Sequence, residues 1–395
     1  MVYTQGCIIS SLKINSGMSN KISILFDAYH LYHLPQFDPL IKLLENDERF
    51  MVYYSTYSQN RKEEVGICSS VLKKRTGEFI FDNDESKREK KIRDLDLDVF
   101  ICGWSRYNLD SYVRDNTLVG MIYHGIGVKP SYWKDNHQRL DLRFVEGKYR
   151  LNQLREKGVK TDLALTGFIK LDPLFNSIHS DSKELNKKLG LDPHKKTILF
   201  APTFYPSSLE KIGMKLGEYT SNYNVILKPH LWTFFLDVFG DGINLKKQRR
   251  LVYKLAEKFD NIKLLGPEDY NILPYYKISD VLLTEASSTI YEMIALSKPV
   301  VVNRFYKLKL SHRLSEKRIY KRRLNKKMNQ DVETFCFTAD KPSELPAVLD
   351  MAIKKRHKDY QTMREYQNKM LYKLDGCAAA RARDEILDRV KKIIF

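Results

Sequence analysis

The chain has 395 residues, of which 43% are hydrophobic and 29% charged, and this composition excludes wholesale disorder. Its length fits two domains, and its formal net charge of +18 favours anionic partners such as nucleic acid, acidic lipid headgroups or phosphorylated substrates. No apolar run approaches the roughly 20 residues of a membrane-spanning helix, so we expect a cytoplasmic protein.

Strand candidates alternate with helix candidates along the chain, a pattern typical of parallel sheets covered by helices. Residues 1–20 have no clear period and are expected to be a leader. Short apolar runs in the first half predict buried parallel strands at 22–26, 50–54, 99–102, 118–123, 142–145 and 163–166. These strands are expected to build a Rossmann-like, acceptor-binding domain over residues 21–180.

A polar stretch at residues 176–188 is predicted to link this half to a second series of strands. The second series lies at 198–201, 224–227, 262–265, 281–284 and 300–303, with helices predicted at 272–276, 289–296 and, as one long charged stretch, 345–394. We expect a Rossmann-like, donor-binding domain over 181–350 and a C-terminal helical segment over 351–395. Two doubly wound α/β domains would face one another across a cleft at the carboxyl ends of their strands.

The first loop of interest comes after the strand at 118–123 and reads His124-Gly125-Ile126-Gly127-Val128-Lys129. A histidine at the mouth of a buried strand is placed as a general base would be. The two glycines let the backbone approach a ligand closely. A histidine with a purely structural role is the alternative.

Two further loops come after strands of the second half. Ala201-Pro202-Thr203 brings a hydroxyl to the expected cleft, and Lys228-Pro229-His230 brings two basic side chains. Lysine and protonated histidine can both stabilise charge that develops on a leaving diphosphate. Each loop is also compatible with an ordinary polar turn.

The strand at 281–284 runs into Glu285-Ala286-Ser287-Ser288-Thr289, and an apolar-periodic helix starts directly after it. A helix N-terminus presents unpaired amide donors, and hydroxyls add to them, so this loop is suited to a phosphate group. The alternative is that Ser287 or Ser288 only caps the helix. Glu292 lies one turn after Ser288, where it would contact a ribose diol or remain a solvated carboxylate.

Together these motifs resemble the CDP-glycerol glycerophosphotransferase family, the teichoic-acid primases and polymerases with a GT-B fold. The resemblance spans about residues 95–305, in the family's order. Two positions depart from its pattern: Tyr205 stands where the family usually has arginine, and Glu285-Ala286 replaces an asp-tyr pair. The resemblance implies catalytic roles for His124 and His230 and acceptor contacts from Gly125 and Lys129. It implies donor contacts from Lys228, Thr203, Ser287, Ser288, Thr289 and Glu292.

By this resemblance the protein would move a polyol-phosphate unit from CDP-glycerol or CDP-ribitol to a hydroxyl of a membrane-linked glycan or teichoic-acid-like polymer, with release of CMP. The alternative is a GT-B glycosyltransferase that uses a nucleotide sugar in capsule or lipopolysaccharide synthesis. No H-E-x-x-H or C-x-x-C spacing occurs, so we expect no metal, and no cofactor beyond the nucleotide-linked donor.

Residues 307–327 carry ten lysines and arginines with interleaved leucines, isoleucine and tyrosine. This amphipathic character is typical of segments that lie on an anionic membrane, and a solvated helix face is the alternative. We therefore expect a peripheral location on the inner face of the cell membrane. Nucleic-acid binding is not expected, because no zinc finger, RNP-type strand or isolated helix-turn-helix is recognisable.

Overall fold

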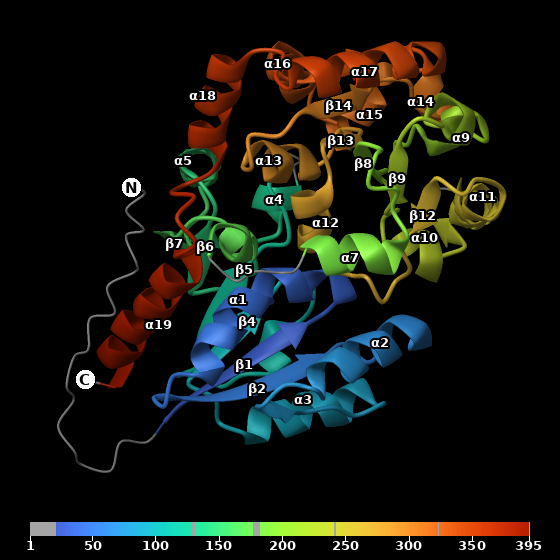
Figure 1. Ribbon diagram of the computed structural model, residues 1–395. Helices are drawn as coiled ribbons and strands as arrows, with labels where there is room; N and C mark the ends of the chain where they lie inside the picture. Colours follow the sequence, from blue (N-terminus) through green and yellow to red (C-terminus); the bar gives the residue numbers. More distant parts are fainter. Residues whose placement is uncertain (1–20, 128–130, 177–181, 241, 323, 395) are drawn as a thin grey trace.

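Two parallel β-sheets, each with helices packed on both faces, form the body of the protein (Figure 1). The computed structural model describes residues 21–127, 131–176, 182–240, 242–322 and 324–394. The expected leader at 1–20 lies outside the described residues. The two doubly wound α/β domains expected from the sequence are confirmed.

The N-terminal sheet has the strand order β3-β2-β1-β4-β5-β6-β7. Its strands are β1 (Ile22–Ala28), β2 (Phe50–Thr56), β3 (Glu78–Phe79), β4 (Val99–Cys102), β5 (Leu118–Ile122), β6 (Leu142–Val145) and β7 (Asp162–Leu165). All six strands predicted in this half are confirmed. The β3 strand was missed, because it has two residues and no buried side chain.

Helices cover the two faces of this sheet. They are η1 (Leu31–His33), α1 (Leu34–Glu45), α2 (Lys62–Leu72), α3 (Glu85–Asp94), η2 (Leu109–Ser111), α4 (Ser131–Lys134), α5 (Lys148–Glu156), η3 (Ile169–Leu171) and α6 (Asp172–Phe175). Since β1 is central and pairs with both β2 and β4, the loops after β1, β4 and β5 lie at the same edge of the sheet.

The C-terminal sheet has the order β12-β9-β8-β13-β14-β15. Its strands are β8 (Thr197–Ala201), β9 (Asn224–Leu227), β12 (Ile262–Leu264), β13 (Val281–Thr284), β14 (Val300–Asn303) and β15 (Phe337–Ala339), and a separate hairpin pairs β10 (Val238–Phe239) with β11 (Ile243–Asn244). The five strands predicted here are confirmed, whereas β15 and the hairpin were missed. The loops after β8, β9 and β13 converge at the edge that faces the other domain.

The helices of this half fall partly where they were predicted. They are α7 (Ser182–Leu189), α8 (Leu209–Ile212), α9 (Lys215–Tyr219), α10 (Trp232–Phe235), α11 (Leu245–Lys258), α12 (Leu273–Ile278), α13 (Thr289–Ile294), α14 (Leu310–Arg313), α15 (Glu316–Arg322), α16 (Lys326–Phe335) and η4 (Pro342–Glu344). The expected polar linker at 176–188 is helical from Ser182 onward, because α7 packs Leu185 and Leu189 against the C-terminal core.

The long helical stretch predicted at 345–394 is three helices: α17 (Leu345–Lys355), α18 (Tyr360–Met370) and α19 (Ala378–Ile394). Figure 1 shows α18 and α19 descending from the C-terminal domain along one side of the molecule to the N-terminal domain. There α19 packs against α1, and its Ala382, Ile386 and Val390 join the N-terminal core. Among the described residues, no helix is both long and apolar enough to span a bilayer.

Asp172 caps the first turn of α19, because its buried carboxylate accepts hydrogen bonds from the amides of Ala378 (3.1 Å) and Ala379 (2.7 Å). Asp172→Ala should therefore lower the free energy of unfolding by about 2 kcal/mol in urea denaturation. Burial raises the pKa of this carboxyl from 3.8 to about 6, so its contribution is complete below pH 3.8 and is lost as the pH rises through 6. The measurement therefore belongs near pH 4.

The matched control is Asp359→Ala, which removes the exposed N-cap of α18 at the amide of Thr362. Its expected cost is about 1 kcal/mol, since water can satisfy an exposed amide. If Asp172→Ala lowers the free energy of unfolding by no more than Asp359→Ala does, Asp172 does not act as a buried cap of α19.

Candidate functional site

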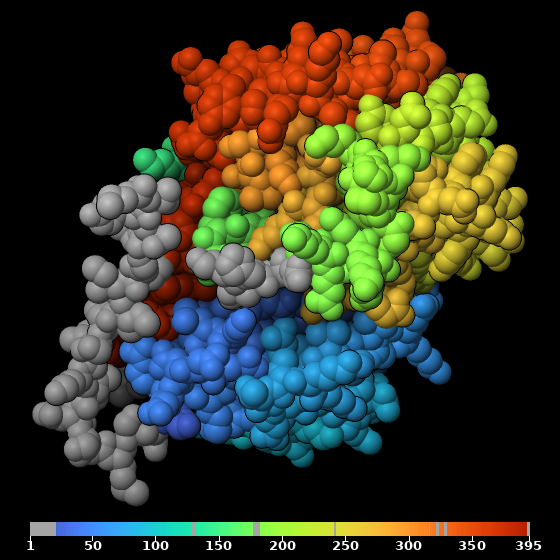
Figure 2. Space-filling model, in the orientation of Figure 1, coloured from blue at the N-terminus to red at the C-terminus, as the bar shows by residue number. Residues whose placement is uncertain are grey.

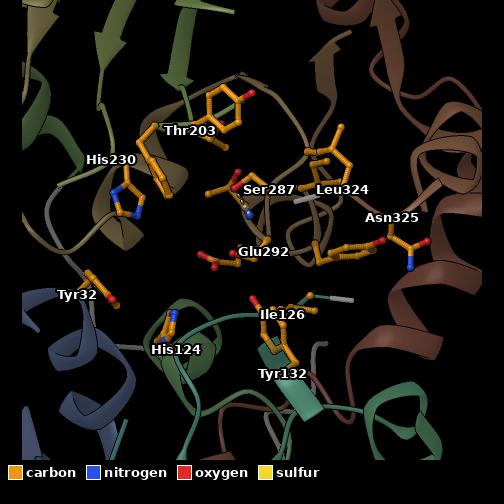
Figure 3. A pocket seen from close by; sticks show the side chains of 18 of the residues that line it. Tyr32, His124, Ile126, Tyr132, Thr203, His230, Ser287, Glu292, Leu324 and Asn325 are labelled. Carbon is orange, nitrogen blue, oxygen red and sulfur yellow. Dashed lines mark hydrogen bonds between the residues drawn. The ribbon is translucent and has the colours of Figure 1, made fainter. Parts of the chain in front are cut away.

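A cavity of about 510 Å³ lies between the two domains, where the loops after the strands meet. The N-terminal domain lines it with Tyr32, Trp104, Arg106, Tyr123, His124 and Tyr132, and the C-terminal domain with Phe204, His230, Trp232, Ser287, Ser288 and Glu292 (Figure 3). This interdomain cavity joins side chains that are far apart in the sequence, and its volume suits a small-molecule ligand.

The loop after β5 approaches the C-terminal domain closely at Gly125. A β-carbon added at Gly125 would lie 3.0 Å from the Tyr132 hydroxyl and 3.5 Å from Oγ of Ser288. At Gly127 it would lie 2.6 Å from the ring of Tyr132. A side chain at Gly127 would therefore clash with Tyr132, and one at Gly125 would be tight against the Tyr132 hydroxyl. The expected close approach to a ligand stays a prediction.

His124 sits among aromatic and basic rings. Its ring centroid is 4.9 Å from that of Tyr32 and 5.2 Å from that of His33. Burial, helped by the positive charge of Arg106, lowers the pKa of His124 to about 3. Within the described part of the chain, its Nδ1 atom has no hydrogen-bond partner. His124 lines the cavity, and a neutral imidazole can accept a proton at its unprotonated ring nitrogen.

His230 lies on the opposite wall, as Figure 3 shows, with Tyr32 between it and His124. The ring centroids of Tyr32 and His230 are 5.9 Å apart. His230 also contacts the rings of Phe204 (4.8 Å) and Trp232 (5.3 Å), and its Nδ1 accepts the amide of Trp232. This aromatic wall holds the imidazole in place and provides flat surface on which a planar ligand group can stack.

Lys228 does not line the interdomain cavity. It is 7% exposed at the end of β9, and burial lowers its pKa to about 8, with Asp269 acting in the opposite direction. The ammonium group therefore contributes positive charge from behind the cavity wall rather than direct contact.

The loop after β13 brings Ser287, Ser288 and Thr289 to the cavity at the start of α13. Ser288 occupies the N-cap position, yet its side chain makes no capping hydrogen bond. The Oγ of Ser287 accepts the amide of Thr289 at 3.3 Å. Ser287 therefore bonds the start of the helix, whereas Ser288 lines the cavity without a capping hydrogen bond, so a role as helix cap does not account for both serines.

Glu285 is a fully buried carboxylate that holds the loop after β8 in place. It accepts hydrogen bonds from the amide of Thr203 (2.6 Å), from the amide of Ser208 (2.9 Å) and from the Ser208 hydroxyl. Asn303 donates to the same hydroxyl at 3.0 Å. Burial raises the pKa of Glu285 to about 7. Glu285, one of the two departures from the family pattern, therefore holds the loop after β13 against the loop after β8.

Glu292 lines the cavity but is already paired. Its Oε2 accepts a hydrogen bond from Nζ of Lys170 at 2.6 Å and from the hydroxyl of Tyr276 at 3.0 Å, and both members of the ion pair are buried. Lys170 lies in η3, which packs on α1, so this pair links the two domains. The expected ribose contact remains a prediction, to which the structure adds a positioning role.

Several cavity residues were not predicted from the sequence. Arg106 stacks its guanidinium 4.7 Å from the ring centroid of Trp104, donates to the hydroxyl of Tyr123 at 3.0 Å, and pairs with Asp135 at 3.1 Å. Two sequence features could have indicated these residues. Polar and aromatic side chains follow buried strands in the tyrosine-rich loop after β1 and in the Gly103-Trp104 turn after β4.

Most of the predicted site residues are brought together. His124, His230, Thr203, Ser287, Ser288, Thr289 and Glu292 all line the interdomain cavity, and Gly125 lies beside it. Lys228 is set back, and Lys129 lies outside the described residues. The catalytic and binding roles of these residues stay predictions.

Comparison with known proteins agrees with the motifs. A family model described as CDP-Glycerol:Poly(glycerophosphate) glycerophosphotransferase matches residues 134–388, more than half of the chain, which confirms the family resemblance. The teichoic acid poly(glycerol phosphate) polymerase of Bacillus spizizenii is 26% identical over 129 residues, 30% of this chain and 28% of that protein. The teichoic acid glycerol-phosphate primase of the same organism is 24% identical over 144 residues, 36% and 34% of the two chains. The chain thus spans about a third of the length of these relatives.

Solved structures share the fold, which confirms the expected GT-B arrangement. The wall teichoic acid polymerase TagF superposes with a TM-score of 0.65 at 15% identity, over 94% of this chain and 90% of that one. A variant of TagF soaked with CDPG gives the same TM-score and identity, over 94% and 89%. A UDP-N-acetylglucosamine 2-epimerase from Listeria monocytogenes, described as putative, gives 0.59 at 13% identity, over 94% and 98%.

Glu285→Ala should destabilise the fold, because it leaves three buried donors at Thr203 and Ser208 without an acceptor. The expected loss is about 3 kcal/mol in the free energy of unfolding at pH 4.5, where the contribution of this carboxyl is complete. Glu268→Ala, at an exposed carboxylate, is the matched control and should cost little.

The pH dependence sharpens this test. A carboxyl whose pKa rises on folding, here from 4.5 to about 7, binds its proton more tightly in the folded state. Its stabilising contribution is therefore complete below pH 4.5 and is lost as the pH rises to 7. The difference between wild type and Glu285→Ala should shrink by about 3 kcal/mol over this range, and a constant difference would show that Glu285 is not buried as described.

Proposed function

We propose that the chain, which belongs to the CDP-glycerol:poly(glycerophosphate) glycerophosphotransferase family, transfers a polyol-phosphate unit from CDP-glycerol or CDP-ribitol to a hydroxyl group and releases CMP. The acceptor would be a membrane-linked glycan or a teichoic-acid-like polymer. The observation that carries the proposal is that the His124-Gly125 loop and the Ser287-Ser288 loop meet across one cavity. The names of the relatives, a polymerase and a primase of glycerol phosphate, support it.

His124 is the proposed general base. Its neutral ring takes the proton from the acceptor hydroxyl, and the resulting oxygen nucleophile attacks the phosphorus that carries the polyol. A pKa of about 3 makes the free imidazole a weak base. A bound diphosphate raises that pKa, because nearby negative charge favours the imidazolium form. Binding of the donor would thus make His124 a stronger base for the reaction in which that donor is consumed.

The donor diphosphate is proposed to lie against His230 and the loop that starts α13. A bond forms between the acceptor oxygen and the polyol-bearing phosphorus, the bond from that phosphorus to the bridging oxygen breaks, and the electron pair stays on CMP. The Nε2–H of His230, whose Nδ1 accepts the Trp232 amide, stabilises this developing charge together with the hydroxyl of Ser288 and the field of Lys228. The proposed chemistry therefore calls for no cofactor beyond the donor.

His124→Ala should lower the rate of CMP release from CDP-glycerol by at least about 100-fold, since it removes the general base. Thermal shift with CDP-glycerol should still show binding, because the donor contacts lie on the other wall. The control is His194→Ala, an exposed histidine far from the cavity, which should keep full activity. Full activity of His124→Ala would refute the role of His124 as the general base. Turnover of sugar nucleotides, with no turnover of any CDP-polyol, would favour a glycosyltransferase.

Association with an anionic membrane is the second part of the proposal. The basic segment 307–327 does not form a single amphipathic helix. Ile319 and Leu324 are buried, whereas Leu310 and Leu314, one turn apart around α14, are 66% and 79% exposed. Exposed cations at Arg313 and its neighbours surround the two leucines. Two apolar side chains amid positive charge favour insertion at a negatively charged bilayer surface.

The double variant Leu310→Ser, Leu314→Ser should bind phosphatidylglycerol-containing vesicles at least about tenfold more weakly in sedimentation assays, since apolar burial is lost. Met51→Ser, at an exposed methionine on β2, is the control and should bind like wild type. Equal binding by the double variant and wild type would exclude α14 as the membrane contact.

A further inference from the structure

We propose that a basic groove beside the interdomain cavity binds consecutive phosphodiester groups of a polyol-phosphate chain. The groove has a volume of about 900 Å³ and lies entirely on the C-terminal domain. Its cationic lining comes from Lys211, Lys246, Lys247, Arg250, Lys254, Lys307 and Arg313. This inference rests on the proposed function, because it names how a polymeric substrate of that reaction would be held.

The charge of the basic groove is almost entirely of one sign. Glu210 is its only lining carboxylate among the described residues, and it pairs with Lys307 and more loosely with Lys247 at 3.9 Å. In the same described part of the chain, Lys246, Arg250 and Lys254 form no ion pair. A concave surface lined by unpaired cations focuses positive potential and attracts polyanions.

Helix α11 arranges three of these cations in a row. Lys246, Arg250 and Lys254 come one after another at intervals of four residues, on one face of the helix. Four residues of an α-helix rise about 6 Å. A three-carbon polyol phosphate has six backbone bonds per repeat, twice as many as a peptide residue, so its extended repeat is about 7 Å. The spacing of the cations therefore matches the spacing of successive phosphates.

The basic groove adjoins the interdomain cavity. Tyr306, in the segment after β14, lines both, and so forms the wall between them. In this proposal, a polymer whose end lies in the cavity continues past Tyr306 into the groove. In Figure 2 the yellow segment that contains α11 lies at the outer edge of the C-terminal domain, beside the yellow-green segment of α9, where a chain has open access.

A lipid headgroup shares the phosphodiester chemistry, but the shape of the site favours a chain. The cations of α11 line a hollow, whereas a bilayer presents a broad surface that meets protruding groups such as Leu310 and Leu314. A flexible chain can enter a hollow and contact several cations at once. The two sources predict different behaviour, which can be measured separately.

The test is binding of synthetic oligo(glycerol phosphate) with six phosphates, compared with glycerol phosphate, by fluorescence anisotropy over a range of salt concentrations. The variant is Lys246→Gln, Arg250→Gln, Lys254→Gln on α11. It should bind the oligomer about tenfold to 100-fold more weakly at low salt, and its slope of log affinity against log salt should fall by about 2 to 3. Binding of glycerol phosphate should not change.

The matched control is Lys62→Gln, Lys87→Gln, Lys90→Gln, which removes the same charge from exposed positions of the N-terminal domain. It should bind the oligomer like wild type, and both variants should keep the wild-type melting temperature. Equal loss in both variants would mean a general charge effect and would overturn the groove. So would a triple α11 variant that loses binding to phosphatidylglycerol vesicles but keeps oligomer binding.

Activity separates the inference from the proposed function. If the enzyme turns over CDP-glycerol, the α11 variant should lose the rate advantage of long over short acceptors and keep its rate with a single glycerol phosphate. If oligomer binding depends on α11 but no CDP-polyol is turned over, the proposed reaction is refuted and the proposed role of the groove still stands. If a CDP-polyol is turned over but the oligomer does not bind, the proposed role of the groove is refuted and the proposed reaction still stands.

Discussion

The ion pair between Lys170 and Glu292 fixes how the two domains meet, and the interdomain cavity depends on it. Both side chains are nearly buried, and Tyr276 completes the contact with the carboxylate. A buried pair of this kind adds little net stability compared with apolar packing, but loss of one partner leaves an uncompensated charge. We therefore expect its main effect to be specificity of arrangement. The close approach of Gly125 to Ser288 across the cavity requires that arrangement.

The same short segment also anchors the end of the chain. Asp172 lies two residues after Lys170 and caps α19, so one stretch of backbone holds α13 of the C-terminal domain and the helix that returns to the N-terminal core. A carboxylate and an ammonium so close in sequence serve two different partners because η3 and α6 form a tight turn. Residues 169–172 therefore contact both α13 and α19.

Much of this architecture is predictable from the sequence because buried parallel strands are continuous apolar runs, and eleven such runs are strands in the structure. The loops after these runs converge by geometry at one edge of each sheet, so His124, His230 and Ser288 could be found without knowledge of the fold. Lys170 and Tyr32 could not, because their importance comes from contacts across the domain interface. Arg106 could not either, because its partners come from other loops of its own domain. The charge pattern did not separate the three C-terminal helices, although Asp359 and Gly376, an N-cap and a positive-φ turn at +71°, mark the breaks.

The charge of the protein illustrates the limit of composition as a guide. A net charge of +18 is compatible with nucleic acid, lipid or phosphorylated substrates, and only position discriminates among them. The cations near α14 surround exposed leucines, which suits a bilayer surface, whereas those of α11 line a hollow in regular order, which suits a chain of phosphates. Inside the interdomain cavity, burial lowers the pKa of His124, which favours its neutral form. One excess of positive charge is therefore divided into regions that differ in shape and in solvent access, and we expect these differences to select a different anion for each region.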